Sequence, residues 1–462
     1  MRPCGRDRVR GVRPVLKRYG SPSGGPGGTV LGQLVHVSED NKLVFELISI
    51  PLFTGVIGYL TNWSGVLMLF QPLRYYGMRV PGLKLLFPFL PRRVQVIPVL
   101  SKDGRLGWQG IVPSRVDKMA SIATDKALSK VGSISDFYRE LEPDKIADQL
   151  LATARREIRG VVTGILEREH PQLWHDLPPA LKEAVFVRVE QQLPSIIHQV
   201  TDEIGNHIEQ LIDAKLMIIR YFREHPELMN AVFRDIGKKE LTFMQNFGFY
   251  FGVPMGVILV FIVRAWPYWW VLPVGGVVIG YVVNYIGITM IFEPVNPRRF
   301  GPVTLQGLFL KRQPEASEVF AEIIATKVIT IENVGHELLH GPRSDRTHQM
   351  LEQVLRPAVD QALGPAQSAV RVAIGTREYD RIRASLATET AGFTSIFSDP
   401  SFNEAQAEKI QSFVARQMRK LSSEEFAELL RSAIKSDEWL LFVHGAVLGF
   451  GAGLVHLGIF GV

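Results

Sequence analysis

Two apolar stretches decide the fold of this 462-residue chain: GVIGYLTNWSGVLMLF, residues 55–70, and GVVIGYVVNYIGITMIF, residues 276–292. Neither contains a charged side chain, and each carries one asparagine near its middle, Asn62 and Asn284. Apolar runs of this kind are typical of helices that cross a membrane. A side-chain amide is unfavourable there unless it has a hydrogen-bond partner, so we expect both asparagines to have a specific role.

Four stretches of the chain contain runs of 23 or more residues without a charge. A transmembrane helix needs about 20 mostly apolar residues. We therefore predict spans at residues 43–73, 241–264, 265–292 and 439–462. Aromatic residues at 266–270 flank the third span, suit a membrane interface, and lie in a short turn that separates it from the second span. The alternative is buried helices of a large soluble protein, but four such long runs together argue against it.

The stretches between these spans have a different character. Residues 74–240 and 293–438 are charged and show apolar residues at three- and four-residue spacing, as in DKIADQLLATARREIRGVVTGIL. We predict two helical extramembrane domains there. The expected fold class is therefore an all-α integral membrane protein with about four transmembrane helices.

Residues 1–42 are predicted to form a disordered basic tail. The part before Gly20 carries seven basic residues and one acidic residue, which accounts for the whole net charge of +6. The basic pI is thus weak evidence for nucleic acid, and no nucleic-acid partner is expected. The tail is either a disordered extension, which an over-extended translation start would also produce, or an arm for phosphate or anionic lipid. Cys4 is the sole cysteine, so one chain cannot form a disulfide or a cysteine metal cluster.

The sequence contains an internal repeat. Gly58, Asn62 and Gly65 correspond to Gly280, Asn284 and Gly287, each 222 residues later. The later spans also match, because GFYFGVPMG and GAVLGFGAG both place glycines at four-residue spacing, 197 residues apart. We therefore predict two tandem copies of one unit: a span, a helical domain and a glycine-striped span.

This order of elements fixes the expected topology. Each helical domain enters after one span and leaves by the next, so both domains lie on the same side and the copies run parallel. Basic residues flank the spans on that side: Arg74, Arg79, Lys238, Lys239, Arg298, Arg299, Arg431 and Lys435. The positive-inside rule places the domains in the cytoplasm, although the charges of the tail favour the opposite orientation.

The intramembrane motif is the main candidate site. In each copy its two glycines and asparagine lie at i, i+4 and i+7 and share one helix face: Gly58, Asn62, Gly65, Gly280, Asn284 and Gly287. We expect the two faces to meet near a pseudo-two-fold axis, with the amides bonded to each other or to backbone. Two interpretations stay open: the amides hold helices together, or they line a polar path for a solute or ion.

One motif is typical of zinc proteases. HELLH, residues 336–340, matches H-E-x-x-H and makes His336 and His340 the metal candidates. Gly341 and Pro342 follow at once and predict that the helix ends there. The third histidine of the longer pattern is missing at its spacing. We therefore expect no catalytic residue, no metal and no cofactor.

The motif IGYLTNWSGVLMLFQP, followed by GWQGIVP, resembles the bacterial membrane protein family called domain of unknown function 445. That family's pattern is similar to I-G-Y-x-T-N-x-x-A-x-x-M-L-F-x-P. The chain departs from it at Gly65, where alanine is usual, and Val283 replaces the threonine in the second copy. The resemblance runs from about residue 43 to the C-terminus. It implies a multi-pass protein of the bacterial cytoplasmic membrane and no established activity.

Two functions follow as hypotheses. The first is a non-enzymatic envelope scaffold that handles lipids or envelope proteins along its amphipathic helices, with homo-oligomers as a further partner. The second is a transporter or channel that uses the paired asparagines. Zinc hydrolysis at HELLH is a remote third.

Overall fold

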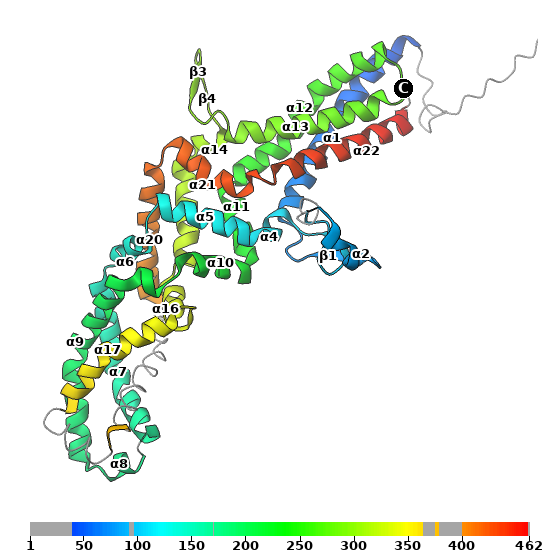
Figure 1. Ribbon diagram of the computed structural model, residues 1–462. Coiled ribbons are helices and arrows are strands. Elements are labelled where there is room, and N and C mark those ends of the chain that lie inside the picture. The colour runs from blue at the N-terminus through cyan, green and yellow to red at the C-terminus, as the bar shows by residue number, and fades with distance from the viewer. Residues whose placement is uncertain (1–38, 92–96, 170, 364–374, 378–399, 461–462) are drawn as a thin grey trace, which may run out of the picture.

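Figure 1 shows the computed structural model of the chain, which describes residues 39–91, 97–169, 171–363, 375–377 and 400–460. The predicted basic tail, residues 1–42, lies outside the described residues except for its last four, which begin the first helix. The described chain is almost entirely helical, with two short two-stranded sheets. The prediction of an all-α chain is confirmed.

Four long helices form a bundle (Figure 1): α1 (Glu39–Phe70), α12 (Lys238–Ala265), α13 (Val271–Phe292) and α22 (Glu438–Phe460). All four are long and apolar enough to cross a membrane, which is compatible with an integral membrane protein. Their positions confirm the predicted candidate spans. Residues 266–270 form the predicted short turn between α12 and α13, and the helix of the third span begins at Val271 rather than at residue 265.

The bundle helices pack in two close pairs. α1 runs along α12, and α13 runs along α22. Apolar side chains also cover the outside of the bundle, as expected of helices in lipid; exposed examples are Leu52, Leu60, Tyr250, Val278 and Val447. Pro51 and Pro254 lie inside α1 and α12 without ending either helix.

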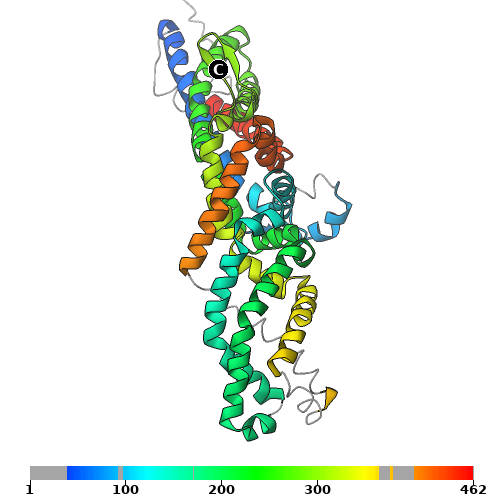
Figure 2. The same ribbon diagram turned by 90° about the vertical axis from the view of Figure 1, so that its left-hand side faces the viewer.

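A helical body lies at one end of the bundle (Figures 1 and 2). Its helices come from both segments between the spans: α4 (Ile111–Ser114), α5 (Val116–Lys130), α6 (Ile134–Glu140), α10 (Ala214–Glu224), α11 (Pro226–Ile236), α14 (Leu308–Lys311), α15 (Gln313–Ile323), the π-helix η2 (Ile324–Val328), α16 (Ile331–His340), α20 (Pro400–Lys420) and α21 (Ser423–Lys435). One continuous apolar core joins them and reaches the ends of α1 and α13. The two segments predicted as separate domains therefore pack as one body.

A long arm extends from the body away from the bundle (Figures 1 and 2). It consists of α7 (Pro143–Glu169), α8 (Pro171–Asp176), α9 (Pro179–Leu211) and α17 (Ser344–Leu363). At 1.5 Å per residue, α9 alone is about 50 Å long. Ala154, Ile158 and Leu193 form the seam between α7 and α9. The arm is thus a narrow helical extension with a small apolar core of its own.

Two short antiparallel strand pairs follow in the sequence, one after α1 and one after α13. The first pairs β1 (Tyr76–Arg79) with β2 (Arg105–Trp108) and carries α2 (Leu83–Leu86) and the 3-10 helix η1 (Phe87–Phe89) between them. The second pairs β3 (Arg298–Phe300) with β4 (Val303–Leu305) around Gly301, whose φ of 59° is accessible to glycine. The sequence predicts neither, because strands this short carry no readable alternation.

Candidate functional site

The first pair of bundle helices meets backbone to backbone. A Cβ atom added at Gly58 of α1 would lie 2.2 Å from the carbonyl oxygen of Gly248 in α12. A Cβ added at Gly248 would lie equally close, 2.2 Å, to the carbonyl oxygen of Gly58. Both contacts are with backbone atoms, which cannot rotate away. Any side chain at either position would push the two helices apart.

Asn62 bridges the same two helices one turn along α1. Its Nδ2 atom donates a hydrogen bond of 2.6 Å to the carbonyl oxygen of Met244, and the residue is 1% exposed. A helical carbonyl oxygen has a second lone pair, so it can accept this bond as well as its own helical one. A Cβ at Gly248 would lie 2.9 Å from the Asn62 Nδ2 atom. Gly248 therefore leaves room for both the backbone contact and the amide.

The second pair of helices repeats this arrangement. Cβ atoms added at Gly280 and Gly276 of α13 would each lie 2.1 Å from a carbonyl oxygen of α22, that of Gly445 and Gly449 respectively. The Asn284 Nδ2 atom donates a bond of 2.8 Å to the carbonyl oxygen of Leu441. A Cβ at Gly445 would lie 2.3 Å from that Nδ2 atom. Glycine is thus required at Gly445 for the same two reasons as at Gly248.

The two asparagines act separately. Each amide bonds a backbone carbonyl of the neighbouring glycine-bearing helix, Asn62 on α12 and Asn284 on α22. The alternative in which the amides bond each other is therefore wrong, and the alternative in which they bond backbone is the one observed. The physical reason is the packing: each face lies against a glycine stripe, which lets the backbones approach more closely than two asparagine faces could.

The remaining two glycines of the motif lie outside these tight contacts. A Cβ at Gly65 would lie 3.6 Å from the Nδ1 atom of His444 in α22. A Cβ at Gly287 would lie 3.4 Å from the ring of Phe247 in α12. Both distances are ordinary or nearly ordinary van der Waals contacts. Gly65 and Gly287 therefore face the other helix pair and have room for a methyl group.

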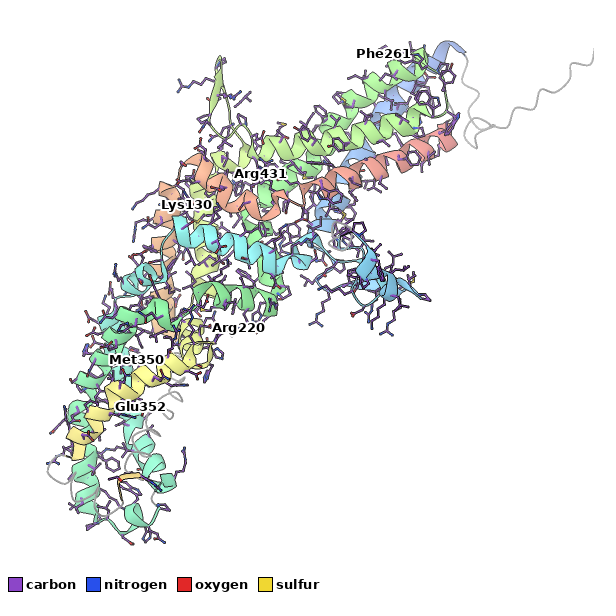
Figure 3. All side chains as sticks on the ribbon, in the orientation of Figure 1. Lys130, Arg220, Phe261, Met350, Glu352 and Arg431 are labelled. Carbon is purple, nitrogen blue, oxygen red and sulfur yellow. The ribbon has the colours of Figure 1, made fainter. Side chains whose placement is uncertain are left out.

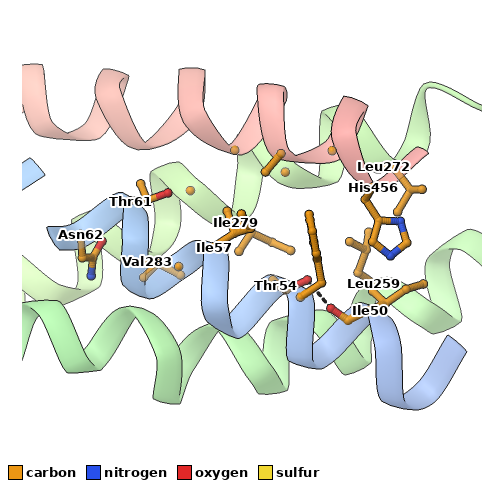
Figure 4. A pocket seen from close by; sticks show the side chains of 17 residues that line it. Ile50, Thr54, Ile57, Thr61, Asn62, Leu259, Leu272, Ile279, Val283 and His456 are labelled. Atoms are coloured by element: carbon orange, nitrogen blue, oxygen red, sulfur yellow. Dashed lines mark hydrogen bonds between the residues drawn. The ribbon is translucent and has the colours of Figure 1, made fainter. Parts of the chain in front are cut away.

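A cavity of about 50 Å³ lies between the helix pairs (Figure 4). Its lining is mostly apolar, with the polar side chains of Thr54, Thr61, Asn62 and His456. Thr54 Oγ1 donates to the carbonyl oxygen of Ile50 at 2.7 Å, and the His456 ring packs edge-on against Phe53 with centroids 5.1 Å apart. The cavity has room for a few water molecules. It is a void between the two helix pairs.

The HELLH motif lies in the body, at the end of α16. The helix ends at His340 with Gly341 as its cap, which confirms the predicted end. His336 and His340 are exposed, with ring centroids 5.0 Å apart. Glu337, which would be the base of a zinc protease, is 3% exposed and forms an ion pair with Arg220. Within the described residues no third His, Cys, Asp or Glu completes a metal site.

Sequence reasoning missed two ion pairs at the base of the bundle. Arg312, the residue just before α15, donates to both carboxylate oxygens of Glu240, at the start of α12, at 2.7 Å. Arg115 reaches Asp437, just before α22, at 3.4 Å. A signal was present: each acid immediately precedes or begins an apolar helix, where a buried carboxylate needs a cation.

The same region holds exposed carboxylates with perturbed ionisation. Hydrogen bonds from Arg312 and Lys239 lower the pKa of Glu315 to about 2. The ammonium of Lys130 and the backbone and hydroxyl of Ser422 lower the pKa of Glu425 to about 2. Glu425 lies in α21 and Lys130 in α5, so this pair links helices from the two segments. These groups stabilise the body and contact no cavity or metal candidate.

No protein-family model matches the chain, no curated protein matches it, and no solved structure matches it.

Proposed function

We propose that this chain is a non-enzymatic integral membrane scaffold, in which a four-helix anchor holds a helical body and a long arm at one face of a bilayer. The observation that carries this proposal is the close packing of the two helix pairs of the anchor, α1 with α12 and α13 with α22. The contact surface within each pair is here called a seam. Glycine backbones touch in both helix pairs, and the Asn62 and Asn284 amides are bonded to backbone carbonyls. Lipid supplies no hydrophobic drive for helix association, so close backbone approach and interhelical hydrogen bonds supply it.

The anchor and body are two copies of one unit around a pseudo-two-fold axis. The seam contacts support this, because the bond from Asn62 to Met244 has its counterpart, from Asn284 to Leu441, 222 residues later on one helix and 197 on the other. Glu240 and Asp437 are also 197 residues apart, as are Arg312 and Arg115.

The contacts between the copies are reciprocal. α5 of the first copy packs on α21 of the second, while α15 of the second packs on α11 of the first. The two ion pairs cross in the same way, with Arg115 binding Asp437 and Arg312 binding Glu240. Such an exchange explains why the two segments share one core, and it makes each copy incomplete without the other.

The family and location belong to the same proposal. The resemblance of residues 57–72 to domain of unknown function 445 favours a bacterial cytoplasmic membrane. Basic residues at the body end of the bundle, such as Arg74 and Lys238, favour a cytoplasmic body under the positive-inside rule. The arm then extends into the cytoplasm, where its amphipathic helices bind a lipid or protein partner.

Cross-linking from the tip of the arm tests the scaffold function. Leu181 and Val187 of α9 are apolar and exposed. A photoreactive amino acid at either position, in the full chain in cells, is expected to capture a discrete partner that mass spectrometry identifies. The matched control is Val447 of α22, which faces lipid in this account and should capture only lipid. A result in which neither arm position captures a partner contradicts the scaffold.

Transport is the second candidate, and the cavity of Figure 4 is the observation that favours it, because Thr61, Asn62 and His456 line it. The variant Asn62→Leu with Asn284→Leu separates the two functions. In the scaffold account the purified protein gives no ion or solute flux in proteoliposomes, and the variant costs about 0.6–2 kcal/mol of stability for each lost bond. Flux in the natural protein that the double variant abolishes, with the fold intact, would establish transport instead.

A further inference from the structure

The most basic stretch of the described chain is the first hairpin region. Its described residues, 74–91 and 97–109, are here called the basic wing and contain five basic side chains and one acidic side chain, Asp103. The chain outside this wing and the N-terminal tail is net acidic. Arg79, Lys84 and Lys102 are exposed. The wing is therefore a concentrated positive charge on an otherwise acidic molecule, which suits an anionic partner.

Large apolar side chains are also exposed on the basic wing. Phe89 of η1 is 86% exposed and Leu85 of α2 is 78% exposed. Tyr76, Met78 and Leu86 of the same segment are exposed as well. Several large exposed apolar side chains gathered in one short segment favour contact with a protein or a membrane. The combination with arginine and lysine is the pattern of segments that lie in a membrane interface.

Hydrogen bonds hold the root of the basic wing at the end of α1. The Gln109 Nε2 atom donates to the carbonyl oxygen of Leu73 at 2.8 Å, and the Gly110 N–H donates to that of Pro72 at 3.0 Å. α1 ends at Phe70, only a few residues earlier. The wing therefore starts where the first span leaves the bilayer, and in Figure 1 it lies beside the bundle rather than along the arm.

The second hairpin has the same placement on a smaller scale. Residues 294–307, here called the short wing, contain Arg298 and Arg299 and no acidic residue. Both arginines and Leu305 are exposed. The Gly307 N–H donates to the carbonyl oxygen of Pro294 at 3.0 Å, so this root is held at the end of α13. In Figure 1 the short wing rises on the opposite side of the bundle from the basic wing.

We infer that both wings lie on the bilayer surface beside the anchor and bind anionic phospholipid. The arginines and lysines bind headgroup phosphates, while Phe89, Leu85 and Leu86 enter the boundary between headgroups and acyl chains. The occupant is the bilayer that the anchor itself crosses, because each wing continues directly from a span and its charge complements an anionic leaflet. The inference rests on the membrane placement of the proposed function.

A fluorescent probe at Phe89 tests the inference in the full chain. Cys4→Ser with Phe89→Cys provides a single labelling site for a polarity-sensitive dye. The labelled protein is reconstituted in vesicles of phosphatidylcholine alone and of phosphatidylcholine with phosphatidylglycerol. We expect blue-shifted emission and several-fold weaker quenching by aqueous iodide when phosphatidylglycerol is present. Lys84→Glu with Arg79→Glu should remove that dependence on phosphatidylglycerol.

Two control positions separate the possible failures. Val447→Cys reports the lipid-facing side of α22 and should be protected in every vesicle, whereas Leu181→Cys on the arm should be quenched freely. A Phe89 probe quenched as strongly as the Leu181 probe, while Val447 stays protected, overturns the inference and leaves the anchor intact. A Val447 probe that iodide reaches overturns the anchor. Protection at Phe89 that rises with the protein-to-lipid ratio means that a second copy covers the wing, which also overturns the inference.

Discussion

At the scale of single residues, the glycines and asparagines between the paired helices depend on each other. Gly248 and Gly445 let the facing backbone approach and also leave space for an amide that reaches a carbonyl one turn away. Neither role is possible with a side chain at those positions. Asn62 and Asn284 each donate one hydrogen bond to a backbone oxygen, which lowers the cost of burying an amide between apolar helices.

Gly58→Ala and Gly65→Ala form a matched pair of variants on one helix. The methyl group at Gly58 would lie 2.2 Å from a backbone oxygen, whereas at Gly65 the nearest atom is 3.6 Å away. We expect Gly58→Ala to lower the free energy of unfolding by about 3 kcal/mol, the upper end for overpacking, and Gly65→Ala to change it little. Unfolding curves in mild detergent measure both. Equal losses in the two variants would show that α1 does not meet α12 at Gly58.

At the scale of elements, the sequence predicts the bundle helices and the end of α16 well. Charge-free runs define the spans, and the Gly341–Pro342 dipeptide marks the helix end. The sequence could not predict which helix accepts the hydrogen bond from each asparagine. Periodicity shows which face of a helix carries a residue, but not which neighbouring helix that face meets. The packing of α5 on α21 and of α15 on α11 was hidden for the same reason. Both are long-range contacts that local patterns do not encode.

Glu240→Gln tests the ion pair that holds α15 against the start of α12. Glu240 is buried and Arg312 binds both of its oxygens. Removing the negative charge leaves the arginine without its buried partner, so we expect a loss of about 3 kcal/mol in the free energy of unfolding. Lys239→Gln is the control, since the pair of Lys239 with Glu315 is exposed and such pairs contribute about 0–1 kcal/mol. A loss in Glu240→Gln no greater than in the control argues against this contact.

Acid should loosen the contact between α5 and α21. The pKa of Glu425 is lowered to about 2 from an ordinary value of 4.5. A carboxylate with a lowered pKa stabilises the fold above its unfolded pKa, and this stabilisation is lost as the pH falls from about 4.5 towards 2. We expect the melting temperature of the body to fall across that window, and Glu425→Gln to reduce the fall. An identical fall in the variant would assign the acid sensitivity to other groups.

At the scale of the whole molecule, bundle, body and arm follow one another (Figures 1 and 2). Figure 3 places Phe261 towards the far end of the bundle, Arg431 at its base, and Met350 and Glu352 on the arm. The short turn of residues 266–270 lies at the end of the bundle opposite the body. Both charged segments therefore emerge at one end. Because both segments emerge at the same end, their helices can pack together in a single core.

The most direct test of this account is the sidedness of three single-cysteine variants in sealed membrane vesicles. In a Cys4→Ser background, Asp176→Cys reports the first segment, Glu404→Cys the second, and Tyr268→Cys the turn between α12 and α13; all three positions are exposed. A membrane-impermeant thiol reagent should label Asp176→Cys and Glu404→Cys from the same side and Tyr268→Cys from the other. Labelling of Asp176→Cys and Glu404→Cys from opposite sides, or of all three from one side, would contradict the four-span anchor.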